Sequence, residues 1–240
     1  MFSYDLSLRY EDGQRQLTDE LSLLYSAEIR AFRNDLRNLI EFYFVESVEG
    51  RDVYSYRNIS QAYTQGIECN LRLALAIDDI GVFSVLGGYQ FLDAKDVQVL
   101  EAIDKGEAGT IDGLLTREDY HGLWGRSQNS GSLRIQYDSP DHAWSTNVRF
   151  QFIGRYGDES LDKNGIVISD PPRKVLDRDD EFVQGYVVVN LALTRSFMFN
   201  AQRLIIGTGI NNLLDEFHPT LIPGLVGRQF YAQHLVSEFL

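Results

Sequence analysis

Aliphatic or aromatic residues alternate with polar or small ones, position by position, in several short segments of the chain. The clearest segment runs from Ile67 to Leu75, where Glu68, Asn70 and Arg72 separate the apolar positions. Because successive side chains of a β-strand point to opposite faces, this period of two predicts strands with one apolar and one polar face. The same alternation returns at residues 2–10, 21–29, 83–91, 133–137, 144–152 and 187–193.

The alternation predicts about nine strands, and the connections between them differ in length. The strands are residues 2–10, 19–30, 62–75, 81–92, 131–138, 143–156, 184–195, 203–213 and 227–239. Short connections cover residues 11–17, 76–80, 139–142 and 196–202, and long ones cover residues 31–61, 93–130, 157–183 and 214–226. We expect a further hairpin, 36–45 with 52–58, in the first long connection. In the second, we expect a short helix over 97–104 that continues through 111–115.

This layout predicts an all-β, antiparallel, up-and-down transmembrane barrel portion with short periplasmic turns and long extracellular loops. A soluble β-sandwich is the alternative, but its connections are typically only a few residues long. Aromatic residues lie near the strand ends on the apolar face, as in the interfacial girdles of a barrel. They are Phe2, Tyr10, Phe83, Tyr89, Phe91, Tyr137, Trp144 and Phe152. No segment approaches the roughly 18 apolar residues that a membrane-spanning helix needs.

Charge and cysteine content narrow the possible functions. The net charge of −13 excludes nucleic acid as an expected partner, because phosphate binding needs a concentrated basic surface. The single cysteine, Cys69, excludes an internal disulfide framework and a cysteine-based zinc cluster. It falls on the apolar face, where we expect a small buried or lipid-facing residue. The first residues lack the basic and apolar regions of a signal peptide, so we expect none.

The sequence offers little catalytic chemistry. Its four histidines are too scattered for a proposed metal cluster or triad, and no Gly-x-Ser-x-Gly elbow occurs. We therefore expect neither an enzyme nor a cofactor. The oxygen-bearing residues Asp158, Asp162 and Asn164 are spaced like those of some calcium loops, but Ser169 stands where such a loop needs glutamate. A solvated acidic loop is the preferred interpretation of this segment, and a cation site is the weaker one.

Motifs in the last third of the chain point to a family. Residues 204–215 read Leu-Ile-Ile-Gly-Thr-Gly-Ile-Asn-Asn-Leu-Leu-Asp, and a Pro-Gly pair and Gly-Arg-Gln-Phe-Tyr follow. This resembles the closing hairpin of TonB-dependent outer-membrane receptors. In that family a strand ends in Asn-Leu-Phe-Asp, a loop contains Pro-Gly, and Gly-Arg-x-Phe-Tyr opens the final strand. The matching residues are Asn212, Leu213, Asp215, Pro223, Gly224, Gly227, Arg228, Phe230 and Tyr231.

Three further stretches resemble the same family in order and spacing: residues 4–10, residues 56–71 and residues 88–94. Two features depart from it. The family's chain normally ends on an aromatic residue, whereas Leu240 follows Phe239 here. His234 and Glu238 interrupt the alternation of the last strand, and a local bulge would restore its register.

The resemblance implies that residues 1–240 are the C-terminal part of a receptor barrel, without the plug domain, TonB box and signal peptide. A receptor of this family imports a scarce nutrient, such as a ferric siderophore or a cobalamin-like compound, across the outer membrane of a Gram-negative cell. Its partners would be outer-membrane lipid, the missing N-terminal barrel and plug portion, and the TonB complex through that portion only. Alone, the chain would neither transport nor catalyse. A porin-like or adhesin-type barrel without TonB coupling is the alternative.

The resemblance also suggests where ligand and plug would bind. The polar face carries arginines in mid-strand, namely Arg72, Arg134 and Arg149, and Arg155 lies near a strand end. These four would contact the plug or an anionic iron chelate through charge-assisted hydrogen bonds. The alternative is that they pair with lumenal carboxylates such as Glu20, Glu28 and Glu68. In the long loops, the aromatic candidates for ligand contact are Tyr120, Trp124 and Phe217.

Overall fold

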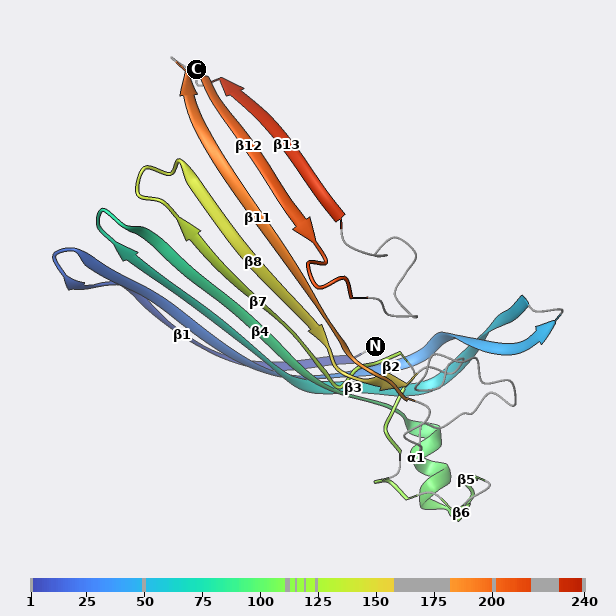
Figure 1. The fold of residues 1–240 in the computed structure, drawn as a ribbon. Coiled ribbons are helices and arrows are strands. Elements are labelled where there is room, and N and C mark those ends of the chain that lie inside the picture. Colours follow the sequence, from blue (N-terminus) through green and yellow to red (C-terminus); the bar gives the residue numbers. More distant parts are fainter. Residues whose placement is uncertain are drawn as a thin grey trace.

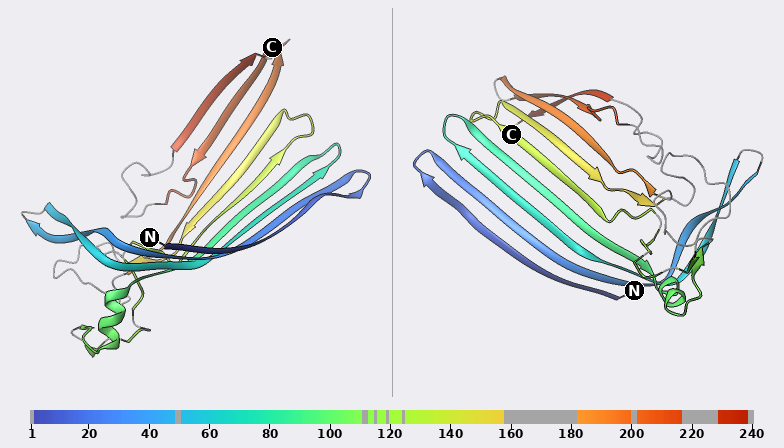
Figure 2. Two further views of the ribbon diagram at one scale, coloured as in Figure 1. Left: turned by 180° about the vertical axis from the view of Figure 1, so that it is seen from behind. Right: turned by 60° about the horizontal axis from the view of Figure 1, so that its bottom comes forward.

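The chain forms one large antiparallel sheet in a computed structural model (Figure 1). The structure describes residues 2–48, 51–110, 113–114, 116–118, 120–123, 125–157, 182–199, 202–216 and 229–238. The sheet has nine strands in the order β1-β2-β3-β4-β7-β8-β11-β12-β13, so that each strand lies beside its neighbours in the sequence. This up-and-down order confirms the predicted fold class. Within the described residues the sheet is curved but not closed, and β1 and β13 form its two edges (Figure 2).

Several strands of the sheet are longer than the alternation suggests. They are β1 (Phe2–Thr18), β2 (Leu21–Val48), β3 (Arg51–Ile77), β4 (Gly81–Asp96), β7 (Asn129–Asp138), β8 (Trp144–Ile153), β11 (Tyr186–Phe199), β12 (Gln202–Asn211) and β13 (Gln229–Glu238). Smaller elements occur in the connections. They are α1 (Val97–Asp104), the pair β5 (Gly109–Thr110) and β6 (Gly113–Leu114), and the pair β9 (Tyr156–Gly157) and β10 (Phe182–Val183).

The first two connections differ from prediction. The stretch 11–17, expected to be a turn, continues β1 to Thr18 with two register shifts. In the stretch 31–61 the predicted hairpin of 36–45 with 52–58 is present, but it is not separate from the sheet. It is the outer part of β2 and β3, which pair from Leu21↔Ile77 to Val48↔Arg51. Both faces of a strand are wet outside the lipid, so the side-chain alternation ends there while the backbone ladder continues.

The outer part of the β2–β3 hairpin has no other strand beside it in the sheet. Strand β1 reaches only Asp35, and β4 reaches only Ala62. Beyond these residues β2 and β3 pair with each other alone, and the hairpin bends away from the sheet (Figures 1 and 2). A long two-stranded arm therefore projects from the end of the sheet that carries the long connections.

The connection between β4 and β7 contains the predicted helix. The helix α1 begins after Asp96, whose carboxylate accepts a hydrogen bond from the Gln98 amide at 2.8 Å, and it ends at Asp104 as expected. Its predicted continuation is wrong where the structure describes it, because Gly113 and Leu114 form strand β6. Glycine disfavours a helix, which accounts for the change of structure here. No helix among the described residues is long and apolar enough to cross a membrane.

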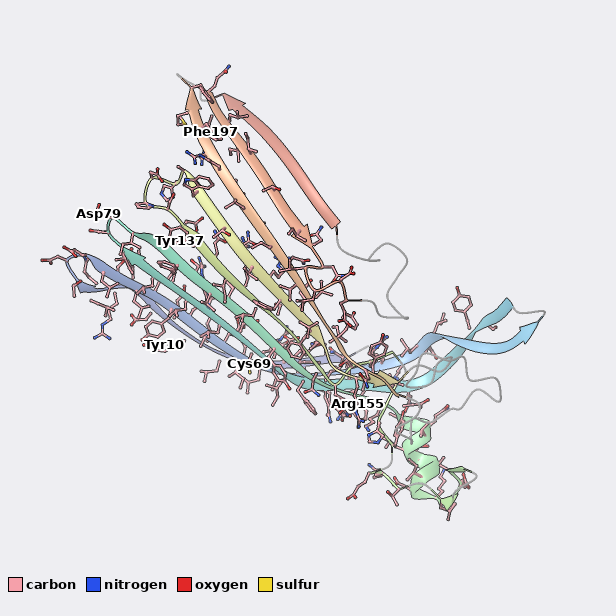
Figure 3. The ribbon with its side chains drawn as sticks, viewed as in Figure 1. Tyr10, Cys69, Asp79, Tyr137, Arg155 and Phe197 are labelled. Carbon is pink, nitrogen blue, oxygen red and sulfur yellow. The ribbon has the colours of Figure 1, made fainter. Side chains whose placement is uncertain are left out.

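A small core lies at this long-loop end. Ala62, Ala94 and Leu123 are buried, and Leu36, Leu39 and Leu92 pack against them. By contrast, the apolar face of the sheet is uncovered: Leu71 is 51% exposed and Ile67 is 44% exposed, although both lie on interior strand β3. Such an extended apolar surface is suited to lipid. Tyr10 and the free, half-buried Cys69 lie on this outer face (Figure 3).

Candidate lumenal binding site

Cross-strand pairing brings three predicted arginines into one line. Arg72 of β3 pairs with Leu86 of β4, Leu86 pairs with Arg134 of β7, and Arg134 pairs with Arg149 of β8. Directly paired residues lie on the same face of a sheet, so the three guanidinium groups occupy one polar row across four strands. We call Arg72, Arg134 and Arg149 the arginine row.

The arginine row lines a hollow on the inner side of the curved sheet. The hollow has a volume of about 590 Å³, and its lining includes the row together with Arg9, Glu28 and Asn70. Gly88 of β4 contributes no side chain to this lining, so the hollow is not filled between β3 and β7. The hollow is therefore a basic depression of a size suited to a small ligand or to a side chain of another domain.

Two carboxylates on the same face, those of Glu68 and Glu11, are paired with other cations. Glu68 lies 3.6 Å from Arg30 and accepts a hydrogen bond from Gln90 at 2.9 Å, while Glu11 lies 2.8 Å from Arg9. Within the described residues no carboxylate is within ion-pair distance of the arginine row. Pairing with Glu20, Glu28 or Glu68 is therefore not what the structure shows.

The arginine row carries an electrostatic cost in the absence of counter-charge. Arg134 and Arg149 are direct cross-strand partners, and like charges in that position repel. The Nε atom of Arg134 is also buried without a hydrogen-bond partner in the described structure. Burying such a donor unpaired costs about 1–3 kcal/mol. An acceptor-rich anion in the hollow would relieve both costs.

Arg155 does not join the row. It follows the end of β8, is exposed, and lies at the long-loop end of the sheet (Figure 3). Its predicted role in ligand or plug contact stays a prediction. The sequence placed it on the polar face but did not reveal how far it lies from the other three arginines.

Tyr120 is an anchor within its loop in this conformation. It is 1% exposed, its hydroxyl accepts a hydrogen bond from the Asp96 amide at 2.9 Å, and the Lys95 ammonium lies 4.7 Å from its ring centroid. Lys95 also donates a hydrogen bond to the Tyr120 carbonyl. Burial lowers the pKa of Lys95, and the Asp93 carboxylate opposes that shift. A direct ligand contact by Tyr120 would require this loop to open, so that role remains a prediction.

Several other candidates lie outside the described residues. They are Trp124, Phe217, Asp158, Asp162, Asn164, Pro223, Gly224, Gly227 and Arg228. No group of three or more possible metal ligands occurs among the residues that the structure does describe.

The closing-hairpin motif has a structural role. Asn212 is 3% exposed with φ +53°, its side chain exchanges two hydrogen bonds with the Glu216 backbone at 2.8 and 2.9 Å, and its amide donates to Asn190. The Leu213 amide donates to the Val189 carbonyl at 2.7 Å, and Asp215 also has positive φ. Asparagine and aspartate tolerate this backbone conformation better than most residues. The motif thus fixes a turn at the end of β12 against β11.

The last hairpin has a regular register. Strands β12 and β13 pair from Gln202↔Glu238 to Asn211↔Gln229 without a shift, so Phe230 and Tyr231 lie opposite Ile210 and Gly209. The bulge considered for this strand is absent from 229–238. His234 and Glu238 therefore occupy register positions of the apolar face.

These features define part of the wall of a transmembrane β-barrel with a polar interior. A family model described as TonB dependent receptor-like, beta-barrel matches residues 2–213, and the chain belongs to this family, whose members are outer-membrane barrels. A comparison with curated proteins finds no match.

A comparison with solved structures finds two proteins that align over nearly all of this chain. One is a mutant of the ferric enterobactin receptor PfeA from Pseudomonas aeruginosa, with 17% identity and a TM-score of 0.50 over 99% of this chain and 31% of that one. Another is the copper transporter OprC, with 13% identity and a TM-score of 0.48 over 99% and 31% of the two chains. The chain thus spans about a third of the length of these proteins, and the likeness to PfeA shows the fold alone.

Proposed function

We propose that this chain supplies barrel wall and extracellular loops to a TonB-coupled outer-membrane transporter in a Gram-negative cell. The family supplies the class, and the arginine row supplies the supporting observation. Three guanidinium groups share one line on the inner face, without a carboxylate partner among the described residues. An anion from outside these residues, either on a plug domain or on a ligand, would pair with them.

An anionic metal chelate fits this requirement, so we favour a ferric siderophore over a cobalamin-like compound as the imported nutrient. Guanidinium groups bind carboxylate and similar oxygen pairs with two parallel hydrogen bonds, and charge-assisted bonds of this kind are roughly twice as strong as neutral ones. The row would contact plug carboxylates at rest and the passing chelate during transport. The remaining barrel strands, the plug and the segment that touches TonB come from outside this chain, so it would not transport alone.

The experiment is an uptake assay on the complete receptor that contains this chain. Arg134→Gln and Arg149→Gln, singly and together, are compared with Arg203→Gln. Arg203 is a matched control because it lies on the same face, near the short turns, where Ser196 accepts its hydrogen bonds at 2.8 and 3.2 Å. Removing one charge-assisted hydrogen bond should lower affinity for a ferric siderophore roughly tenfold or more, since about 1.5–3 kcal/mol is lost. The control should keep its affinity.

Two results would contradict the proposal. If the row variants fold with normal heat-modifiable migration and import at the original rate, the row contacts neither ligand nor plug. If import continues in a host without TonB, the barrel is passive, as in the porin-like alternative.

A further inference from the structure

Strand β11 carries a cation, Arg195, on the apolar face of the sheet, where it cannot take part in lumenal binding. Arg195 of β11 has the parity of Leu191, Leu193 and Phe197, and it pairs directly with Trp144 of β8 and Ile206 of β12. The apolar face meets lipid, so this guanidinium is at the membrane surface of the wall and not in the lumen.

Two aromatic rings hold the guanidinium. Its Cζ atom lies 4.1 Å from the ring centroid of Trp144 and 4.9 Å from that of Phe197. Cation–π contacts of this kind fix the orientation of an arginine without neutralising its charge. The Nε atom is buried and has no hydrogen-bond partner in the described structure. Arg195 is therefore preorganised, but its hydrogen-bonding capacity is incompletely used.

Neighbouring elements provide no counter-ion within the described residues. Strand β11 lies inside the sheet, so the strands on both sides of Arg195 belong to this chain. The carboxylate of Asp141, in the turn before β8, is engaged by the Ser139 hydroxyl at 2.6 Å and the Ala143 amide at 3.0 Å. Asp138 and Arg203 have the opposite parity and face the lumen. Among the side chains that the structure describes, no carboxylate lies within ion-pair distance of Arg195.

The position along the strand identifies the depth in the membrane. Arg195 lies at the short-turn end, where the Ser196 amide donates to Ala143 in the turn before β8. On the same face and at the same end lie the ring pairs Tyr10–Tyr25 and Phe83–Tyr137, with centroid separations of 5.7 and 4.9 Å. Aromatic belts mark the level of the lipid headgroups. Figure 3 shows Tyr137 and Phe197 near this end of their strands.

We propose that Arg195, framed by Trp144 and Phe197, is a binding site for the phosphate of an anionic phospholipid in the leaflet on the short-turn side. A guanidinium offers parallel N–H donors that match two phosphate oxygens, and an anionic headgroup at this depth supplies the missing charge. The rings exclude water from one side of the contact and the acyl chains lie along the apolar face. This inference depends on the membrane-spanning fold and not on transport.

The test uses Trp144 as a built-in reporter. The receptor containing this chain carries Trp124→Phe, so that of the two tryptophans in the chain only Trp144 remains; tryptophans elsewhere in the receptor are replaced likewise. The receptor is inserted into two sets of vesicles. In one set the lipid that carries a quencher on its headgroup is phosphatidylglycerol, and in the other it is phosphatidylethanolamine, at the same fraction. We expect Trp144 quenching to show about a tenfold preference for the anionic lipid. Arg195→Gln should abolish the preference, and Arg195→Lys should retain part of it.

Control variants distinguish a specific phosphate site from general surface charge. Arg203→Gln, at the same end but on the inner face, should leave the preference unchanged. If it causes the same loss, general surface charge is responsible and the proposal is wrong. Equal quenching by both lipids in the unsubstituted protein would also overturn it. So would competition by inorganic phosphate at modest concentration, because the site would then take the free ion. Heat-modifiable migration verifies folding, and Arg195→Lys serves if the glutamine variant does not fold.

Discussion

The spanning sheet and the segment between β4 and β7 are held together in different ways. In the sheet, backbone hydrogen bonds connect every neighbouring strand while apolar side chains on the outer face remain uncovered. In residues 97–128, a few buried groups tie the segment to β4: the Leu123 amide donates to Ala94, and the Leu92 amide donates to Gln128, both at 2.9 Å. The sheet is thus held by a continuous backbone ladder, and the loop is held by a few individual hydrogen bonds and buried contacts.

This difference predicts which substitutions should lower the stability of the sheet or of the loop. Side chains on the outer face have space around them, so exchanges among apolar residues should be tolerated. A position where two backbones approach closely has no such space. In the loop, each buried contact is made once, and its loss should free the segment without affecting the sheet.

The largest expected effect comes from Gly66→Ala in β3. A Cβ atom there would lie 2.0 Å from the Phe91 carbonyl oxygen and 3.1 Å from the Phe32 ring, so the backbone of β3 or β4 must shift. We expect destabilisation at the upper end of the roughly 1–3 kcal/mol range for overpacking. The midpoint of urea unfolding in vesicles, followed by heat-modifiable migration, measures it. Gly87→Ala is the control because only Leu133 Cδ1 is near, at 3.9 Å. Equal midpoints for the two variants would refute this account of the sheet.

An intermediate and local effect is expected from Gly122→Ala. Gly122 has φ +120°, and its Cβ would lie 2.3 Å from the Ala94 carbonyl oxygen, which accepts the Leu123 hydrogen bond. The substitution should detach Leu123 and Tyr120 from β4. Proteolysis within 105–128 should accelerate roughly tenfold, as a local loss of about 1.4 kcal/mol implies, while the unfolding midpoint of the sheet stays unchanged.

Gly125→Ala is the matched control for the loop. Gly125 has φ +64° but no atom within 4 Å of its Cβ position, so only the backbone conformational cost, about 1 kcal/mol, applies. If Gly122→Ala lowers the stability of the whole sheet, the loop and the sheet are one cooperative unit and the comparison fails.

The smallest effect is an acid-induced loosening beside α1. Arg117 donates two hydrogen bonds to Asp104, at 2.7 and 2.5 Å, and these bonds lower the pKa of the Asp104 carboxyl. An aspartate with a lowered pKa stabilises the folded loop above its ordinary value of about 3.9, and this contribution is lost as pH falls through the lowered pKa. Amide exchange in 104–118 should therefore rise at acid pH. In Asp104→Asn it should show no such pH-dependent step, and a step of unchanged size would contradict this assignment.

The sequence predicts the strands of the sheet where lipid lies on one side and water on the other. Beyond Arg30 the sequence predicts the hairpin of 36–45 with 52–58 but not its continuity with the rest of β2 and β3, because both faces are wet there and the alternation is lost. For α1, the capping residue Asp96 and the apolar spacing are local signals, so its bounds were predictable. The order of the strands follows from their number and from the short turns.

Less of the candidate site than of the fold could be predicted from the sequence. Alternation placed Arg72, Arg134 and Arg149 on the polar face, but only the register shows that they form one row. The burial of Tyr120 depends on the path of residues 105–128, which has no periodic signal. Arg195 was missed, although Leu193, Arg195 and Phe197 share one parity and would have revealed it.

The sequential order of the strands has a consequence for how the sheet forms. Every strand of the sheet pairs with the sheet strands that come before and after it in the chain, so no pairing has to wait for a later strand of the sheet to form. Formation can then proceed hairpin by hairpin, with a small loop-closure entropy at each step, as in other topologies of low contact order. The turn at Asn212 is already fixed against β11, so it would help β13 to pair with β12 in the final register.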